Sequence, residues 1–184
     1  MSLQTLINSL EAEPHDMAIV QHLCSPLKVR AIEYDELESM KPLMEVMDYV
    51  DAIVILYTMK SHPVGHFCCF WLSEDRSTVE YFDPYGLSPT EDMDVTHNPH
   101  TLLQYFGTKK VNHNQWRLQK LKQDINTCLY HCSLRLRFMT MSHDQYRSFV
   151  HSSNLKPDTV VCLTQFLVQP KRMPKVLTAQ AEGH

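Results

Sequence analysis

The sequence predicts an α+β fold, in which helices and strands occupy separate stretches of the chain. Three observations support this prediction. Short segments rich in β-branched and aromatic residues follow one another between residues 51 and 83. The stretches on either side have the residue spacing of helices. The chain has 184 residues, of which 43% are hydrophobic, enough for one domain with a substantial core. We therefore expect a mostly antiparallel central sheet flanked by helices.

The N-terminal part is expected to be helical. Residues 2–12 carry leucine and isoleucine at helical spacing, and residues 34–50 also favour a helix. Pro42 interrupts the second stretch, because an internal proline removes a backbone hydrogen bond. We therefore expect two short helical pieces there.

The predicted sheet comes next. "DAIVILYTM" (51–59), "HFCCFWLS" (66–73) and "TVEYFD" (78–83) are short and apolar, as buried strands are. The polar sequence "SEDRS" (73–77) separates the last two and predicts a hairpin loop. Adjacent antiparallel strands are the expected arrangement.

The C-terminal half reads mainly as helices. A short helix should end near Gly107, and "KKVNHN" (109–114) fits an edge strand. Residues 126–141 predict a buried helix, and Ser142 is the expected N-cap of the next one. Residues 156–168 form a last helix or strand. Residues 170–184 are a basic, Pro-rich tail, which we expect to be mobile.

Composition and charge limit the function classes. No segment is apolar for long enough to cross a bilayer, and the first residues lack the pattern of a signal peptide, so we expect the protein not to be secreted. Its six cysteines are then expected to be mostly thiols. The net charge of −4 gives no general indication of nucleic-acid binding. One basic run, Lys109, Lys110, Arg117, Lys120 and Lys122, either follows a phosphate backbone or is a solvated face.

A histidine and an aspartate stand at the ends of the predicted hairpin. His66 opens its first strand and Asp83 closes its second. Antiparallel pairing brings these two positions to the same end of the sheet. An imidazole beside a carboxylate is the oriented base of a catalytic triad, in which the carboxylate also favours the imidazolium.

Cys128 is the best candidate for the nucleophile. It lies at the start of a predicted helix, behind a cap at Asn126 or Thr127. A helix N-terminus and a nearby imidazolium both favour the thiolate of a cysteine. Cys132 lies one turn further along the helix and is expected to be a buried, inert core residue.

Structural interpretations of the same residues remain open at this point. His66 is also explained as a surface residue, Asp83 as the cap of an ordinary turn, and the "TCLYHC" segment as a core helix with two thiols. A zinc site would draw on His66, Cys68, Cys69, His131 and Cys132. Successive strand residues alternate faces, however, and no C-x-x-C pair is present, so we expect no metal site.

Four segments together resemble the adenain-type cysteine proteases of adenoviruses, virophages and Polinton elements, in the clan that includes the SUMO-specific proteases. "GHFCCFWL" is similar to the Gly-His-Trp strand of that family, and "VEYFDPYGLSPTED" to its Phe-Asp-Ser-Tyr-Gly-Leu-x-Pro segment. The stretch 111–138 resembles its Leu-Gln and Thr-Cys-Gly-x-x-Cys motifs, and "MSHDQYRSFV" continues the pattern. The resemblance covers about residues 50–152.

The resemblance implies roles for individual residues. His66 would be the general base, Asp83 its orienting carboxylate, and Cys128 the nucleophile that forms a thioester. Gln119, in "RLQ", would stabilise the oxyanion together with the Cys128 N–H, and Gln123 is the alternative.

Phe67 and Leu129 depart from the family pattern, which has Trp and Gly at these positions. We expect both to be substrate-binding: Phe67 as an apolar lid over the imidazole, and Leu129 as a residue that either narrows the site or marks lost activity. Pro84 replaces the family's Ser after Asp83 and stiffens the turn.

The resemblance also implies a function. Residues 1–184 would be a single protease domain with its core at about 50–169, a monomer that cleaves viral capsid or core precursors, favouring Gly near the cut. It would act in the virion and the infected cell, in the nucleus or at a cytoplasmic assembly site. The chemistry needs no cofactor, although adenovirus relatives use an activating peptide and DNA. The alternatives are a deconjugating protease for ubiquitin-like modifiers and an inactive virion or scaffold protein.

Overall fold

The computed structural model describes residues 2–12, 17–58, 65–122 and 125–168. Helices and strands lie in mainly separate blocks, as the α+β prediction requires. In chain order, the elements are α1 (Leu3–Ala12), η1 (Met17–Ile19), α2 (Val20–Cys24), β1 (Val29–Glu33), η2 (Tyr34–Ser39), α3 (Leu43–Val46), β2 (Ala52–Tyr57), β3 (His66–Leu72), β4 (Thr78–Phe82), α4 (Pro89–Thr96), α5 (Thr101–Phe106), β5 (Lys110–His113), α6 (Cys128–Arg137), α7 (His143–His151) and α8 (Pro157–Val168).

The strands form one mixed sheet in the order β1-β2-β3-β4-β5. The inner pairs, β2 with β3 and β3 with β4, are antiparallel as expected. The outer pairs, β1 with β2 and β4 with β5, are parallel, so the sheet is less antiparallel than predicted. Parallel neighbours need a crossover, and the chain between β4 and β5 supplies one with α4 and α5.

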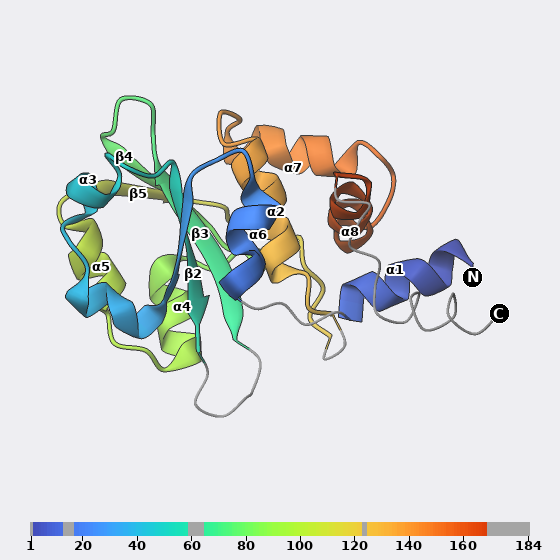
Figure 1. Cartoon of the computed structure of the whole chain (residues 1–184), viewed down its shortest axis with the longest axis horizontal. Helices are drawn as coiled ribbons and strands as arrows, with labels where there is room; N and C mark the ends of the chain where they lie inside the picture. Colours follow the sequence, from blue (N-terminus) through green and yellow to red (C-terminus); the bar gives the residue numbers. More distant parts are fainter. Residues whose placement is uncertain (1, 13–16, 59–64, 123–124, 169–184) are drawn as a thin grey trace.

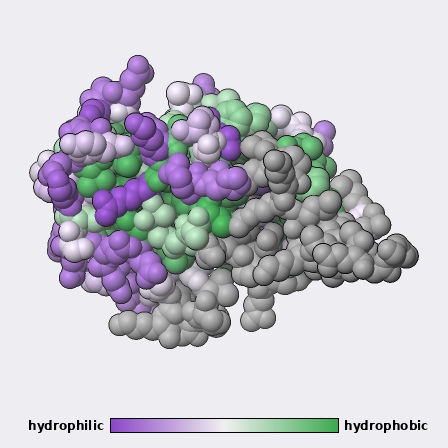
Figure 2. Space-filling view, viewed as in Figure 1, coloured by the Kyte–Doolittle hydropathy of each residue, from purple (hydrophilic) through white to green (hydrophobic). Residues whose placement is uncertain are grey.

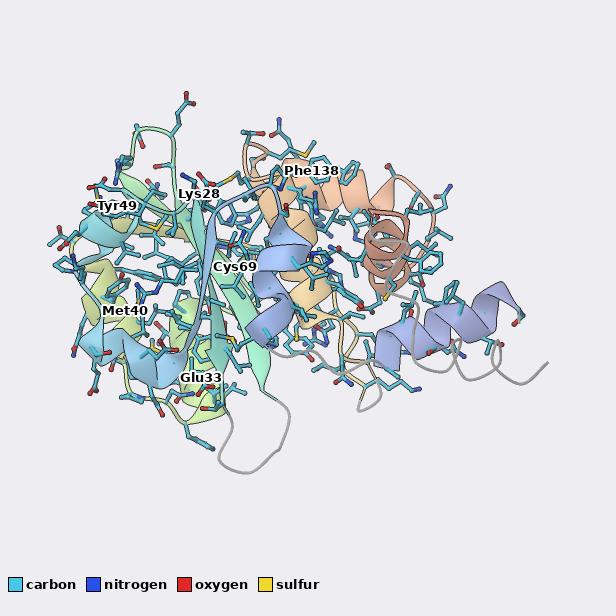
Figure 3. The ribbon with its side chains drawn as sticks, viewed as in Figure 1. Lys28, Glu33, Met40, Tyr49, Cys69 and Phe138 are labelled. Atoms are coloured by element: carbon cyan, nitrogen blue, oxygen red, sulfur yellow. The ribbon has the colours of Figure 1, made fainter. Side chains whose placement is uncertain are left out.

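Helices cover both faces of the sheet (Figure 1). Helices α3, α4 and α5 lie on one side, and α2 and α6 lie on the other, with α8 packed against α6 and α1 against α8. The alternation of side chains along β3 distributes its residues between these layers. Phe70 packs edge-on against Phe106 of α5, whereas Cys69 faces α6 and contacts the backbone oxygen of Cys132 (Figure 3).

A buried arginine fixes the C-terminal end of α6. The guanidinium of Arg135 donates to the backbone oxygens of Phe138, at 2.6 Å, and Met141, at 2.8 Å. It also lies over the rings of Trp71 and Tyr146, at 4.6 and 5.0 Å from their centroids. These contacts offset part of the cost of burying the cation, whose Nε has no partner among the described residues. They also fix α6 against the sheet and α7.

The sequence predicted most elements but missed four. The helices at 3–12, 101–106, 128–137 and 143–151 are confirmed, as are the edge strand β5 and the Ser142 cap, which accepts from the Gln145 N–H. Residues 157–168 are helical, which decides between the two alternatives. The elements that were not predicted are η1, α2, β1 and α4. The basic tail lies outside the described residues.

The surface is mixed in character. Figure 2 shows hydrophilic side chains over much of the sheet half of this face, with apolar ones visible between them. No described helix has the length and apolar character needed to cross a membrane.

Candidate active site

The β3–β4 hairpin places His66 and Asp83 in direct contact. Cys69 lies opposite Phe82 in the ladder, so Asp83 follows β4 where β3 approaches its first residue, His66. The imidazole Nε2 is hydrogen-bonded to Asp83 Oδ1. Both side chains are buried. The predicted pairing is therefore present, and the carboxylate determines which nitrogen of the ring faces away from it.

The turn that carries Asp83 is held by hydrogen bonds on several sides. The Asn114 side chain accepts from the Asp83 N–H at 3.0 Å and donates to the Asp83 oxygen at 2.6 Å. The Leu87 N–H donates to Asp83 Oδ2 at 2.7 Å. Gly86 has φ +79°, and a Cβ there would lie 2.6 Å from the backbone carbon of Trp116. Only glycine fits this position without strain, because the turn packs directly against another stretch of backbone.

Cys128 is the first residue of α6 and interacts with the imidazole. Burial disfavours the imidazolium, but the charge and hydrogen bond of Asp83, followed by those of the Cys128 side chain, raise the pKa of His66 well above 6.5. Since Nε2 is bonded to Asp83, Nδ1 is the nitrogen that remains for the sulfur. The three predicted residues are thus brought together in the order carboxylate, imidazole, thiol.

Tyr85 covers the imidazole. Its ring is stacked on that of His66, with 4.6 Å between centroids and 27° between planes. The sequence predicted Phe67 in this position. Phe67 follows His66 on the strand, so its side chain lies on the opposite face and is buried, 3% exposed, in the core. The structure therefore corrects the position of the lid.

The start of α6 offers backbone donors near the thiol. The first N–H groups of a helix have no carbonyl partner within the helix. Thr127 occupies the N-cap position, one of the two expected, but its side chain makes no capping hydrogen bond to α6. The N–H of Cys128 is one of these N-terminal groups of α6, and its oxyanion role remains a prediction. Leu129 is fully buried in the core, so its side chain presents no surface to a substrate.

Gln119 lies in a stretch of chain that runs beside the Asp83 turn. The N–H groups of Leu118 and Gln119 both donate to the Pro84 oxygen, at 2.9 and 3.0 Å. The Gln119 amide Nε2 donates to the Ile125 oxygen at 3.1 Å, which leaves its second N–H for another acceptor. The oxyanion role of Gln119 remains a prediction, and Gln123 lies outside the described residues.

A second carboxylate, Asp92 on α4, joins the site from the side of the sheet that faces α4 and α5. It accepts from the Tyr81 hydroxyl at 2.7 Å and from the Cys68 thiol at 3.6 Å, and its other oxygen lies 4.0 Å from His66 Nε2. Burial and the neighbouring charge of Asp83 raise the pKa of Asp92 to about 7. Burial, with Asp92 and Asp83 nearby, also raises the pKa of Cys68.

This cluster is the place where the described residues could best hold a metal ion. Donor atoms of His66, Cys68, Asp83 and Asp92 lie within 4.8 Å of one another. Those donors are already paired: His66 with Asp83, and the Cys68 thiol with both carboxylates. An ion would have to displace these protons, so the arrangement suits proton transfer better than metal binding. Cys69 and Cys132 lie outside this cluster. The Cys69 thiol contacts the backbone oxygen of Cys132 on α6, and the Cys132 thiol contacts the backbone oxygen of Phe67 on β3.

Three residues of the site were not predicted from the sequence: Tyr85, Asp92 and Asn114. Tyr85 stood two residues after Asp83, where continuation of the hairpin register would have placed it opposite His66. The capping sequence Ser88-Pro-Thr-Glu91 signals α4, but nothing in its acidic run distinguishes the buried Asp92 from the exposed Asp94. Asn114 carried no signal, because its role depends on where β5 ends beside β4.

Comparisons with known proteins add one significant sequence relative. No protein-family model matches the chain. The uncharacterized protein V9 of Sputnik virophage is 25% identical over 151 residues, which span 74% of this chain and 85% of that protein. The name of that relative states no activity.

Solved structures with similar folds are more distant. The C-terminal Ulp1 protease domain, in complex with Smt3, the yeast orthologue of SUMO, is 10% identical, with 90% of this chain and 81% of that chain covered and a TM-score of 0.49. The central domain of the uncharacterized Lpg1148 protein from Legionella pneumophila is 16% identical, with 86% and 98% covered and a TM-score of 0.46. At these identities no residue role can be transferred.

Proposed function

We propose that the protein is a cysteine endopeptidase that uses Cys128, His66 and Asp83. The observation that carries the proposal is the buried His66–Asp83 pair, whose imidazole also interacts with the Cys128 side chain. The carboxylate of Asp83 orients the imidazole as the base that takes the proton of the Cys128 thiol. Separate core roles for the three residues would not require that they converge from a strand, a turn and a helix end.

The chemistry follows from this order of groups. The Cys128 thiolate attacks a peptide carbonyl, and the oxyanion is stabilised by the Cys128 N–H and, in the proposal, by the Gln119 amide. The C–N bond breaks as the imidazolium of His66 gives its proton to the leaving amine, which leaves a thioester on Cys128. His66 then removes a proton from water, the water oxygen attacks the thioester, and the sulfur leaves as thiolate.

For the biological role, we propose maturation cleavage of viral capsid or core precursors near Gly residues. Two observations support it: the adenain-type motifs in the sequence, and the relative in Sputnik virophage at 25% identity. An activating peptide or DNA is proposed on the same resemblance. Lys110, Arg117 and Lys120 are exposed, and a DNA titration at two salt concentrations tests whether they contact phosphates.

A digest of a proteome-derived peptide mixture, read by mass spectrometry, tests the activity without a known substrate. The full chain should produce cleavages with small residues next to the cut, and Cys128→Ala should produce none while keeping the wild-type circular dichroism spectrum. Cleavage by folded Cys128→Ala would refute the proposal. A parallel panel of Gly-Gly-tailed modifier conjugates distinguishes a deconjugating protease, and no reaction in either assay would favour an inactive scaffold protein.

A further inference from the structure

A second buried histidine–aspartate pair lies beside the nucleophile. His131, one turn after Cys128 on α6, has its Nε2 3.0 Å from Oδ1 of Asp158, in the first turn of α8. His131 is fully buried and Asp158 is 4% exposed. The proposed reaction uses neither residue, so their burial needs another explanation.

Asp158 accepts hydrogen bonds from both ends of one chain segment. Its Oδ2 accepts from the Lys120 N–H at 3.0 Å, directly after Gln119. Its Oδ1 accepts from the Thr127 hydroxyl at 2.5 Å, directly before Cys128. One carboxylate thus links Lys120 to Thr127. These two residues are the direct neighbours of the two proposed oxyanion donors, the Gln119 amide and the Cys128 N–H.

The Thr127 contact has a further effect on α6. A threonine at an N-cap usually turns its side-chain oxygen toward the free N–H groups of its own helix. Here the hydroxyl donates to Asp158, and the Thr127 side chain makes no capping hydrogen bond to α6. The first N–H groups of the helix therefore remain available for the oxygen of a substrate.

The electrostatics are consistent with an ionised carboxylate at this position. Burial opposes ionisation of Asp158, but hydrogen bonding and charge from His131, with the bonds from Thr127 and Lys120, lower its pKa below 3.8. Burial is the main cause of the raised pKa of Tyr85, and the charge of Asp158 is a minor contribution to it. A charged acceptor makes stronger hydrogen bonds than a neutral one.

We propose that Asp158, supported by His131, is a positioning residue that holds the two halves of the oxyanion hole, Gln119 and the N–H of Cys128, in register. The inference rests on the proposed protease function and adds a residue to it. Asp158 acts through Lys120 and Thr127 and does not itself touch the reacting atoms.

Two reagents separate this role from a general effect on the thiol. Acylation by p-nitrophenyl acetate passes through an oxyanion: the sulfur bonds to the acyl carbon, the C–O bond breaks, and p-nitrophenolate leaves. Alkylation by iodoacetamide displaces iodide and forms no oxyanion. The ratio of the two rate constants at Cys128 therefore reports on the oxyanion hole alone.

The experiment compares full-length Asp158→Asn with wild type. We expect acylation to slow about tenfold or more and alkylation to change less than about twofold. Loss of one hydrogen-bond donor from an oxyanion hole lowers the rate about 100-fold, and displacement of a donor should lower it less. Asp144→Asn is the matched control, since Asp144 holds the same second position on α7 but is exposed. It should leave both rates unchanged. An unchanged ratio in folded Asp158→Asn would overturn the inference.

Thr127 variants guard against a folding defect in Asp158→Asn. Thr127→Val removes the hydroxyl and should lower the acylation-to-alkylation ratio, and Thr127→Ser should restore it. Equal ratios in the two variants would count against the inference. If wild type itself shows no acylation above Cys128→Ala, the proposed function fails, which is a different outcome from acylation in wild type that does not depend on Asp158.

Discussion

The rings of Tyr85 and His66 are stacked, with centroids 4.6 Å apart, at the end of the β3–β4 hairpin. The stack limits the access of water to one face of the imidazole and restricts its rotation. An imidazolium that is held in one orientation transfers its proton along a fixed direction. Tyr85 therefore matters to the proposed reaction even though it exchanges no proton in it.

Replacing this ring should slow the reaction. We expect Tyr85→Ala to lower kcat/KM by about tenfold, as loss of orientation of a general base typically does. Tyr85→Phe retains the stacked ring and should stay within about twofold of wild type. Peptide cleavage rates measure both. A Tyr85→Phe variant as slow as Tyr85→Ala would assign the effect to the hydroxyl instead.

Asp83 should control the charge of the imidazole. Burial disfavours the imidazolium of His66, but the charge and the hydrogen bond of Asp83 raise its pKa above the ordinary value. Asp83→Asn removes the charge that opposes the burial of the imidazolium, and the ring should lose its proton at a lower pH than in wild type. NMR titration of the imidazole measures this shift, and cleavage should fall by about 100-fold or more. If the His66 imidazole of Asp83→Asn lost its proton at the same pH as in wild type, Asp83 would not be the cause of the raised pKa.

Among the six cysteines, Cys128 should react first with iodoacetamide at neutral pH. It is 7% exposed, and the other five are fully buried. Burial raises the pKa of Cys24 to about 12 and also raises the pKa of Cys68 and Cys132, which keeps these groups as unreactive thiols. Mass spectrometry of short reactions locates the label. His66→Ala should slow the labelling of Cys128, and equal labelling of all six would contradict the assignment.

Asp92 should make stability depend on pH. Its pKa is about 7 in the folded chain and near 3.8 in a reference peptide, so the folded state binds the proton more tightly. The resulting stabilisation is fully present below pH of about 4 and is lost as the pH rises through about 7. The free energy of unfolding of Asp92→Asn should therefore fall less over this interval than that of wild type. Urea titrations at several pH values measure it, with Asp94→Asn, exposed on the same helix, as the control.

The close approach at Gly86 should be costly to disturb. Gly86→Ala adds a Cβ at 2.6 Å from Trp116 and also strains a backbone with φ +79°. Gly107 provides a matched comparison, because its φ is +64° but a Cβ there meets nothing within 4 Å. We expect Gly86→Ala to lose roughly 1–3 kcal/mol of unfolding free energy and Gly107→Ala less. Similar losses would leave backbone strain alone as the explanation.

The sequence predicted what depends on local pattern. The apolar strands, the hairpin and the Ser142 cap are local features, and the His66–Asp83 pair follows from the hairpin alone. Strand β1 was missed because Arg30 and Glu33 lie exposed on it, so it lacks the apolar run of its neighbour β2. Asp92 and Asn114 could not be identified because their positions depend on long-range packing of α4 and β5, which no local pattern encodes.

The hairpin also has a consequence for the newly made chain. His66 and Asp83 belong to strands joined by one short loop, so this half of the site can assemble from neighbours in sequence. Cys128 lies on a helix that is synthesised later, and it reaches the imidazole only when α6 docks on the sheet. The Cys128 sulfur therefore reaches the imidazole at a late stage of folding. We expect a growing chain on the ribosome to have no proteolytic activity until that docking is complete.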